Sequence, residues 1–386
     1  MNAALCPITD SDASLFVSRY EHSITSDSRL VDGVVENWIS QENGIIFNAK
    51  GARGREQEFY ASEYDLHSES AVSEFMVYGS GQSWGLYDRI AEFIKGSVTR
   101  DAGAILDIGC GKGILLKRLK TALPGWTMAA VEPSKNAHRY FAEVMPEVDL
   151  FNGSFDESPH VNEKFDLVIA NGVLEHVPNP LVFLDAFKQC MSPDGMGFIG
   201  VPNFLNNPVD LYTYDHLSRF TPETIESLFG QCGLEVVTQA SGSDKVPMWY
   251  LIRHGATTDP TPDRLVEQSL KVAETNLTDM RSAFASYDDC VNDALNCSGV
   301  IGIYGTGAIG LLAFGNTRLE VEMVKGMFDD NETMWGSTRC GIEVLPPAAI
   351  QETGITHLLI SANPCYREIM TKKIRDRFPS TLKIFG

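Results

Sequence analysis

Between residues 104 and 252, apolar runs of strand length alternate with amphipathic segments of helix length. Five runs have the composition of buried strands: Ala104–Ile108, Thr127–Val131, Val148–Phe151, Phe165–Ala170 and Met196–Val201. Apolar residues recur at helical spacing in the segments between them, at Ile114–Leu123, Lys135–Val144 and Asn179–Met191. This alternation predicts an α/β fold, with helices covering a parallel sheet. Two further runs, Leu234–Gln239 and Met248–Ile252, are expected to complete the sheet as an antiparallel pair.

A second α/β pattern follows a long helical stretch. Asp263–Leu295 carries an apolar stripe at helical spacing, which predicts one or two helices. Strand-like runs then follow at Val300–Tyr304, Gly341–Leu345, His357–Ser361 and Leu382–Phe385, with a helix at about Cys365–Phe378. Another helix is expected at Ser83–Lys95, where the core begins. We therefore expect four parts: a small N-terminal domain (1–80), an α/β core (81–256), a helical linker (257–298) and a Rossmann-like C-terminal domain (299–386).

The first strand of the core runs into a glycine-rich turn. Its sequence is AILDIGCGKG, in which Asp107 precedes Gly109, Gly111 and Gly113. Glycine permits positive φ and a close approach of the backbone to a ligand, and the start of the next helix offers free N–H groups. Glu132 follows the second strand, where nucleotide-binding folds place an acid that accepts hydrogen bonds from a ribose diol. The pattern predicts a nucleotide or nucleoside site.

Charge and composition narrow the class of partner. The 386 residues carry a formal net charge of -20, which disfavours nucleic acid and anionic membrane surfaces as partners. No apolar run approaches the length of a membrane span, and the N-terminus lacks a signal-peptide pattern. Eight cysteines without a CxxC pair predict reduced thiols and a cytoplasmic protein. A small-molecule substrate is the expected partner, and the oligomeric state is left open.

The glycine turn resembles motif I of class I S-adenosylmethionine-dependent methyltransferases, and the next hundred residues continue the resemblance. It implies a Rossmann-like methyltransferase sheet with S-adenosylmethionine as the cofactor. Asn152-Gly153-Ser154-Phe155 stands where this family contacts the adenine ring, and Asn171 begins the segment after the fourth strand, next to the cofactor. The cofactor-binding residues that the resemblance implies are Asp107, Gly109, Gly111, Glu132, Ser154, Phe155 and Asn171.

The first 80 residues resemble the small zinc-ribbon domain that precedes some sugar methyltransferases. In that domain two cysteine pairs bind zinc. Here the four ligand positions hold Cys6, Thr9, Ser40 and Asn43. A tetrahedral zinc site needs thiolate or imidazole donors, so we expect a ribbon-like shape without zinc, held by packing alone.

The order of ribbon, methyltransferase core, helical linker and Rossmann-like tail is similar to that of sugar C-methyltransferases, which act on nucleotide-linked keto-deoxysugars. Methylation at carbon needs a base with a pKa near neutrality and a donor for the enolate oxygen. The candidate catalytic residues follow the fifth strand: His216 as the general base, with Asp215 and Tyr214. The candidate substrate contacts are Tyr212 and, in a tyrosine-rich stretch, Tyr64 or Tyr60. Glu175 and His176 could form an acid–base pair, but in this family residues in their positions usually hold the local structure.

The C-terminal part contains a second glycine loop, which leaves alternatives open. Gly305–Gly310 has the G-x-G-x-x-G spacing of a dinucleotide fingerprint, and Asp329 follows at the distance of a ribose acid. Its literal interpretation is a redox enzyme with NAD, and the competing one is a Rossmann-like domain without a cofactor of its own. Two other hypotheses remain: an O-methyltransferase of a different small metabolite or natural product, and a non-catalytic protein that binds S-adenosylmethionine.

Overall fold

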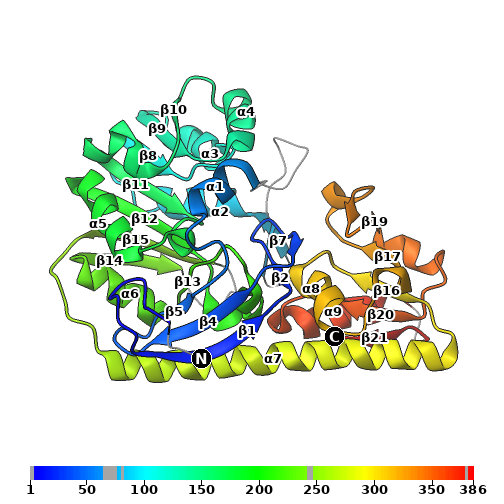
Figure 1. Cartoon of the computed structure of the whole chain (residues 1–386). Helices are drawn as coiled ribbons and strands as arrows, with labels where there is room; N and C mark the ends of the chain where they lie inside the picture. The colour runs from blue at the N-terminus through cyan, green and yellow to red at the C-terminus, as the bar shows by residue number, and fades with distance from the viewer. Residues whose placement is uncertain (1–3, 64–75, 80–81, 241–246, 379–380) are drawn as a thin grey trace. The chain divides into compact units, whose positions relative to one another are not determined.

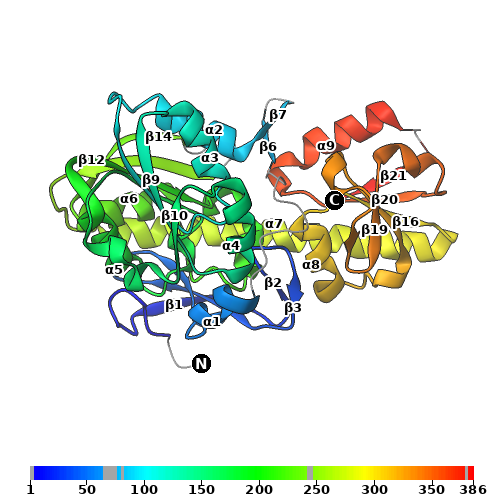
Figure 2. The same ribbon diagram turned by 90° about the horizontal axis from the view of Figure 1, so that it is seen from above.

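The computed structural model describes residues 4–63, 76–79, 82–240, 247–378 and 381–386. The chain divides into two compact units, shown in Figures 1 and 2. The first comprises residues 1–18, 36–205 and 215–270, and the second comprises 19–35, 206–214 and 271–386. Residues from the expected N-terminal domain and from the core thus share one unit. The expected linker is a single helix, α7 (Pro262–Cys297), and the division falls within it.

The first unit contains the sheet predicted for the core. Its strand order is β10-β9-β8-β11-β12-β15-β14. The strands are β8 (Gly103–Ile108), β9 (Trp126–Glu132), β10 (Asp149–Asn152), β11 (Phe165–Asn171), β12 (Met191–Val201), β14 (Leu234–Ala240) and β15 (Met248–His254). The pairs among β8 to β12 are parallel, and β15 pairs antiparallel with both β12 and β14. The predicted α/β class and the antiparallel pair are confirmed.

Helices cover both faces of this sheet because alternate strand residues point to opposite sides. Leu106 and Val168 pack in a core that includes residues of α5 (Pro180–Cys190) and α6 (Pro222–Gln231). Ile105 and Leu167 pack in a second core, formed with α2 (Leu86–Lys95), α3 (Ile114–Ala122) and α4 (Lys135–Val144). Figure 1 shows α5 and α3 on opposite sides of the strands. Burial on both faces explains why the middle strands are apolar throughout.

Strand β12 begins earlier than its apolar run predicts. The turn expected at residues 193–195 lies inside the strand, between Met191 and Val201. Phe165 pairs with Met191, but Leu167 already pairs with Met196, so the intervening residues leave the regular ladder. Such an irregularity lets Pro193 and Gly195 stand within a strand without occupying ladder positions.

A smaller sheet in the N-terminal region joins residues from distant parts of the chain. Its order is β1-β4-β5-β13. The strands are β1 (Ser14–Tyr20), β4 (Val35–Ser40), β5 (Ile46–Asn48) and β13 (Ser218–Arg219). Cys6 packs with Trp38 and Phe47, and Asn43 Nδ2 donates to Cys6 Sγ over 3.7 Å. Two of the four expected ribbon positions therefore meet in the structure.

The remaining elements of the N-terminal region are short. Two strand pairs are β2 (Ser23–Ile24) with β3 (Leu30–Val31), and β6 (Met76–Gly79) with β7 (Gln82–Gly85). Between these pairs lie α1 (Glu56–Glu58) and a π-helical turn at Phe59–Glu63. Strand β7 occupies the start of the expected Ser83–Lys95 helix, so α2 begins at Leu86.

The second unit contains the other predicted α/β sheet. Its strand order is β18-β19-β17-β16-β20-β21. The strands are β16 (Ile301–Tyr304), β17 (Val324–Phe328), β18 (Thr338–Arg339), β19 (Ile342–Leu345), β20 (His357–Ile360) and β21 (Lys383–Phe385). All pairs are parallel except β18 with β19. The helices are α8 (Ala308–Asn316) and α9 (Pro364–Arg377). Among the described residues, no helix is both long and apolar enough to cross a membrane.

Candidate active site

The glycine turn predicted as a ligand loop joins β8 to α3. Gly109, Gly111 and Gly113 have φ values of 71°, 54° and 76°, which only glycine adopts readily. A Cβ on Gly109 would lie 2.5 Å from Val173 Cγ2, so a side chain has no room there. The turn therefore needs glycine for conformation and for packing, and it leads directly into the N-terminus of a helix.

Glu132 lies against this turn, at the end of β9. Its Oε2 accepts from the Gly111 N–H at 2.8 Å, and its Oε1 accepts from the Ser134 N–H at 2.8 Å. Burial nevertheless raises the pKa of Glu132 to about 7, although the two N–H groups lower it. A carboxylate has about four acceptor positions, so these bonds leave capacity for hydroxyl donors from a ligand. The predicted ribose acid is thus held at the glycine loop.

Asp107 is the second buried acid beside the loop. It is 2% exposed near the end of β8. Burial, and then the nearby Glu132, raise the pKa of Asp107 well above its usual range. The same surroundings raise the pKa of the Cys110 thiol. Two buried acids side by side favour a ligand that brings hydrogen-bond donors or positive charge.

The other predicted cofactor residues lie at the carboxyl ends of neighbouring strands. Ser154 caps the 3₁₀ turn Phe155–Glu157 after β10, and its buried Oγ has no hydrogen-bond partner among the described residues. Phe155 is 9% exposed and packs edge-on against Phe183. Asn171 ends β11, and a Cβ on Gly200 would lie 2.3 Å from its Oδ1. An unused hydroxyl, an aromatic face and buried acids suit the polar and apolar parts of a nucleoside.

A second cluster brings Tyr60 together with His176, Asp215 and His216. Tyr60 Oη lies 2.5 Å from His176 Nδ1 and donates to Asp215 Oδ2 at 3.1 Å. The rings of His176 and His216 meet edge to face, with centroids 4.8 Å apart. Oxygen and nitrogen atoms of Glu175, His176 and His216 all lie within 4.8 Å of one another. The cluster gathers several groups that can hold or pass a proton.

The tautomer of His176 follows from one of its contacts. Its Nδ1 lies 3.0 Å from the backbone carbonyl oxygen of Asp215, which can only accept. Nδ1 must carry the hydrogen for this contact to be a hydrogen bond, which leaves Nε2 of the neutral ring as an acceptor. That assignment lets Tyr60 accept from Nδ1–H while it donates to Asp215 Oδ2. His176 therefore has a fixed orientation, with Nε2 as a hydrogen-bond acceptor.

Backbone contacts position both histidines. His176 ends the 3₁₀ turn Leu174–His176 that follows β11, and Leu217 N–H donates to the Glu175 carbonyl at 2.7 Å. The buried Arg219 donates to the His216 carbonyl at 3.1 Å. Asp215 is fully buried and His216 is 7% exposed. The segment after β11 and the segment before β13 are thus tied together.

The sequence named these groups but did not pair them. Asp215 was expected to act beside His216, and the structure shows its carboxylate accepting from Tyr60. His176 was expected to hold local structure, and it contacts both Tyr60 and His216. The sequence did contain two signals for this cluster, the aromatic run around Tyr60 and the polar segment after β11. Nothing in the sequence near either segment indicates that the two are in contact.

The remaining candidate residues belong to the second unit or lie outside the described residues. Tyr212 belongs to the second unit, where it stacks on Tyr20 with centroids 3.7 Å apart and meets Phe284 edge-on. Burial raises the pKa of the Tyr212 hydroxyl far above its usual value. Tyr214 is also in the second unit, and its N–H donates to the Ile24 carbonyl at 2.8 Å. Tyr64 lies outside the described residues.

The second glycine loop is packed within its own unit. A Cβ on Gly305, Gly307 or Gly310 would lie 2.6 to 2.9 Å from Ser361. Ser361 Oγ accepts from the Gly310 N–H, and Asp329 Oδ2 accepts from the backbone N–H and the hydroxyl of Thr306. Packing against the end of β20 thus accounts for the glycines, and both interpretations of this loop stay predictions.

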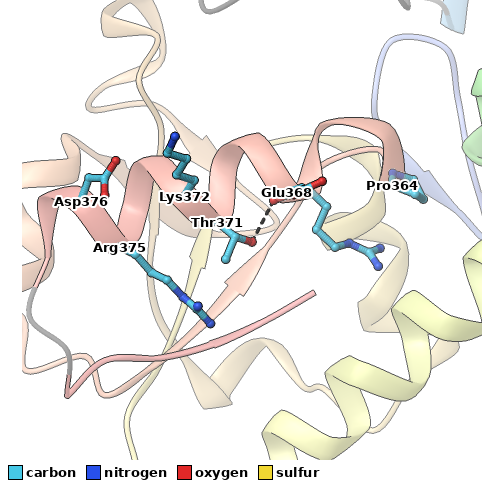
Figure 3. Close-up of a pocket in the computed structure, with 7 residues that line it drawn as sticks. Pro364, Glu368, Thr371, Lys372, Arg375 and Asp376 are labelled. Atoms are coloured by element: carbon cyan, nitrogen blue, oxygen red, sulfur yellow. Dashed lines mark hydrogen bonds between the residues drawn. The ribbon is translucent and has the colours of Figure 1, made fainter.

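An open pocket of about 560 Å³ lies along one side of α9, and it shares no residue with either cluster. Figure 3 shows its lining side chains spaced along this one helix, with the Thr371 hydroxyl bonded back to its own helix. Charges of both signs line it, among them Glu368, Lys372 and Arg375. Its lining comes from one helix and lacks the buried, converging polar groups found in the first unit. The candidate active site is therefore assigned to the first unit and not to this pocket.

Comparisons with known proteins concern the part of the chain that carries the glycine loop. Residues 85–239 match a family described as "Methyltransferase domain". A ubiquinone biosynthesis O-methyltransferase of Ruegeria pomeroyi is 29% identical over 178 residues, covering 39% of this chain and 70% of that protein. One of Dinoroseobacter shibae is 31% identical over 153 residues, covering 34% of this chain and 60% of that protein.

Two further matches differ in how much of the other protein they cover. The match to a ubiquinone biosynthesis O-methyltransferase of Azorhizobium caulinodans spans 40% of that protein at 34% identity. An S-adenosylmethionine-dependent methyltransferase from Clostridium acetobutylicum aligns structurally with a TM-score of 0.38 and 14% identity, over 44% of this chain and 92% of that chain. The family match includes the strands that carry the glycine loop and Glu132. The stretch from residue 85 to residue 239 therefore matches a methyltransferase domain, and S-adenosylmethionine is the cofactor that this match supports.

Proposed function

We propose that the whole chain methylates a polar small molecule, with His216 as the general base. The observation that supports this is the cluster of Tyr60, His176, Asp215 and His216, in which Asp215 and His216 are buried. The cluster follows β11 and precedes β13, at the carboxyl side of the sheet, where α/β folds bind ligands. Residues that only packed the fold would not need two imidazoles and a buried acid around one phenol.

The same residues define what the chain must do chemically. Glu132, Asp107 and the glycine loop would hold the cofactor, which supplies an electrophilic methyl group when bound. His216 would take a proton from the acceptor atom, and His176 would stabilise the charge that develops on the neighbouring imidazole. Tyr60 and Asp215 would fix the His176 ring. Alignment of the acceptor with the methyl group contributes up to about 7–11 kcal/mol in well-oriented reactions.

We further propose a sugar, in particular a nucleotide-linked keto-deoxysugar, as the acceptor. Two features support this choice: the meeting of Cys6 and Asn43 in a ribbon-like N-terminal sheet, and the second Rossmann-like unit after α7. Both follow the order of parts that resembles sugar C-methyltransferases. A carbon acceptor also gives a reason for several proton-holding groups, because a proton must leave a carbon beside a carbonyl.

A second candidate is methylation at oxygen. The relatives from Ruegeria pomeroyi and Dinoroseobacter shibae are named O-methyltransferases of ubiquinone biosynthesis, and each is similar to this chain over part of its length. A hydroxyl acceptor needs only one base, which His216 alone could supply. The nature of the methylated atom separates the two candidates.

The test uses the full chain and S-adenosylmethionine with a ¹³C-labelled methyl group. Nucleotide-linked keto-deoxysugars and a set of phenols are offered in parallel, and products are followed by mass spectrometry. The carbon chemical shift of the new methyl group tells attachment to carbon from attachment to oxygen. A carbon-bound methyl on a nucleotide sugar supports the proposal. Transfer only to phenolic oxygen overturns the sugar proposal, and cofactor binding without transfer to any acceptor overturns the proposed activity.

A further inference from the structure

A cluster of metal-binding side chain types lies in the second unit, outside the methyltransferase domain. Asp293 and Cys297 stand on the last turns of α7, four residues apart, so they share one face of that helix. His357 begins β20 and is 1% exposed. Neither the glycine loop nor the proposed proton-transfer cluster includes any of these residues.

The three donor atoms are already close together. His357 Nε2 lies 2.8 Å from Asp293 Oδ2 and 3.7 Å from Cys297 Sγ, and the three ligand atoms all lie within 4.8 Å of one another. Tetrahedral zinc with ordinary bond lengths separates nitrogen from sulfur by about 3.5 Å and nitrogen from oxygen by about 3.3 Å. The two measured distances from His357 Nε2 therefore differ from those of a zinc site by about half an ångström or less.

The imidazole is held with Nε2 toward the other two ligands. A Cβ on Gly299 would lie 2.3 Å from His357 Cε1, and Phe385 stacks on the ring at 5.9 Å with an interplanar angle of 12°. Thr356 Oγ1 lies 2.8 Å from His357 Nδ1. The 2.8 Å contact with the Asp293 carboxylate places the hydrogen on Nε2 in the metal-free chain. When a metal ion binds, this hydrogen can move to Nδ1, where the Thr356 hydroxyl can accept it, and the Nε2 lone pair becomes available. Ligating histidines in metal sites have such a partner on the second nitrogen.

Electrostatics at this position favour a cation. Cys297 is the last residue of α7, and the C-terminal end of a helix carries partial negative charge. The ammonium of Lys383 lies 2.5 Å from Asp293 Oδ2. His357 Nε2 lies 2.8 Å from the same oxygen. The Asp293 carboxylate is thus already in contact with one cationic side chain, which a metal ion would replace.

We propose that Asp293, Cys297 and His357 form a binding site for a divalent transition-metal ion of the zinc class. A thiolate with an imidazole selects zinc or cobalt over magnesium and calcium, which prefer oxygen ligands. Binding releases the Cys297 thiol proton and replaces the contacts of Lys383 and His357 with Asp293. The hydrogen of His357 moves from Nε2 to Nδ1, so that the Nε2 lone pair can bind the ion. Three protein ligands leave a fourth position for water or an incoming ligand.

The experiment titrates the metal-free full chain with Co²⁺ and records absorption. A thiolate bound to Co²⁺ gives a charge-transfer band in the near ultraviolet, which nitrogen and oxygen ligands do not produce. Cys297→Ser removes the proposed sulfur ligand from an exposed position, and Cys340→Ser is the matched control on another exposed cysteine. We expect the band in the parent chain and in Cys340→Ser, and its loss in Cys297→Ser. Zn²⁺ should abolish the band by competition.

A second variant tests the competition between lysine and metal. Lys383→Met removes the ammonium from Asp293 and should tighten Co²⁺ binding about twofold to fivefold, as expected for the loss of one exposed ion pair. The proposal is overturned if the parent shows no sulfur band at saturating Co²⁺, or if the band persists in Cys297→Ser. Circular dichroism establishes that each variant is folded. Methyl transfer is not the readout, so failure of the proposed function would leave this test unaffected.

Discussion

The hydroxyl of Tyr60 lies 2.5 Å from Nδ1 of His176, although 116 residues separate the two along the chain. The same hydroxyl reaches Asp215 Oδ2, 155 residues away. One phenol thus links three segments of the first unit. Its position between an imidazole and a buried carboxylate lets it orient the imidazole, and this relationship can be tested without changing either histidine.

Tyr60→Phe keeps the aromatic ring and removes the hydroxyl. We expect turnover to fall about tenfold to a hundredfold, which corresponds to the loss of a hydrogen bond to a charged group. The pH profile of turnover should shift, while affinity for S-adenosylmethionine stays unchanged. Tyr366→Phe, on α9 in the second unit, is the control. A normal pH profile in Tyr60→Phe would remove the hydroxyl from the proton-transfer cluster.

His216→Ala should abolish measurable turnover and spare cofactor binding, because a general base contributes about 10²–10⁴-fold. His176→Ala should lower turnover less and shift the pH profile, since His176 acts through its neighbour. Activity is measured with labelled cofactor, and binding is measured by calorimetry. His22→Ala changes an exposed histidine of the second unit and serves as the control. Equal turnover in His216→Ala and the parent chain would exclude His216 as the base.

Cofactor affinity should rise with pH between about 5 and 7. Burial raises the pKa of Glu132 from 4.5 to about 7, so the free protein holds a proton there that the ribose-binding carboxylate must release. The raised pKa of Glu132 also makes the free energy of unfolding depend on pH. The stabilising contribution of protonated Glu132 is fully present below pH 4.5 and is lost as the pH rises to about 7, a change on the order of 3 kcal/mol. Calorimetry and urea unfolding at several pH values measure both trends.

Glu132→Gln should weaken cofactor binding. It should also reduce the pH dependence of cofactor affinity and of the free energy of unfolding. Asp107 shifts in the same direction, so a residual slope is expected. Glu143→Gln changes an exposed glutamate on α4 and controls for net charge. Falling affinity with rising pH in the parent chain would contradict the assignment of Glu132 to the ribose hydroxyls.

Gly109→Ala should cost more than glycine replacement at an open position with similar backbone geometry. Gly109 has a φ of 71° and no room for a Cβ beside Val173, whereas Gly54 has a φ of 81° and no atom within 4 Å of the place that a Cβ would take. Gly54→Ala therefore reports strain alone, about 1–2 kcal/mol for a left-handed residue. Gly109→Ala should exceed this cost in urea unfolding and also lose cofactor affinity. Equal costs and normal affinity would show that the turn tolerates a side chain.

The sequence alone determined most elements of the two larger sheets. Alternating apolar runs predicted all strands of the first sheet and, in the second, β16, β19, β20 and β21, but they missed β17 and β18. The helix at Lys135–Val144 was predicted with the bounds that the structure shows. The glycines before α3 and Glu132, the last residue of β9, lie close in the chain to the turns that they form. Such local features depend on backbone conformation and local burial, which can be inferred from residue type and spacing.

Only the tertiary structure decided which distant side chains meet. Tyr60, His176 and Asp215 lie on three separate segments, and β13 pairs with β5 across most of the first unit's sequence. The sequence likewise did not join Cys297 and Asp293 to His357, at the start of β20. Residue spacing carries no information on such contacts, because they depend on how the packed sheets and helices bring separate segments together.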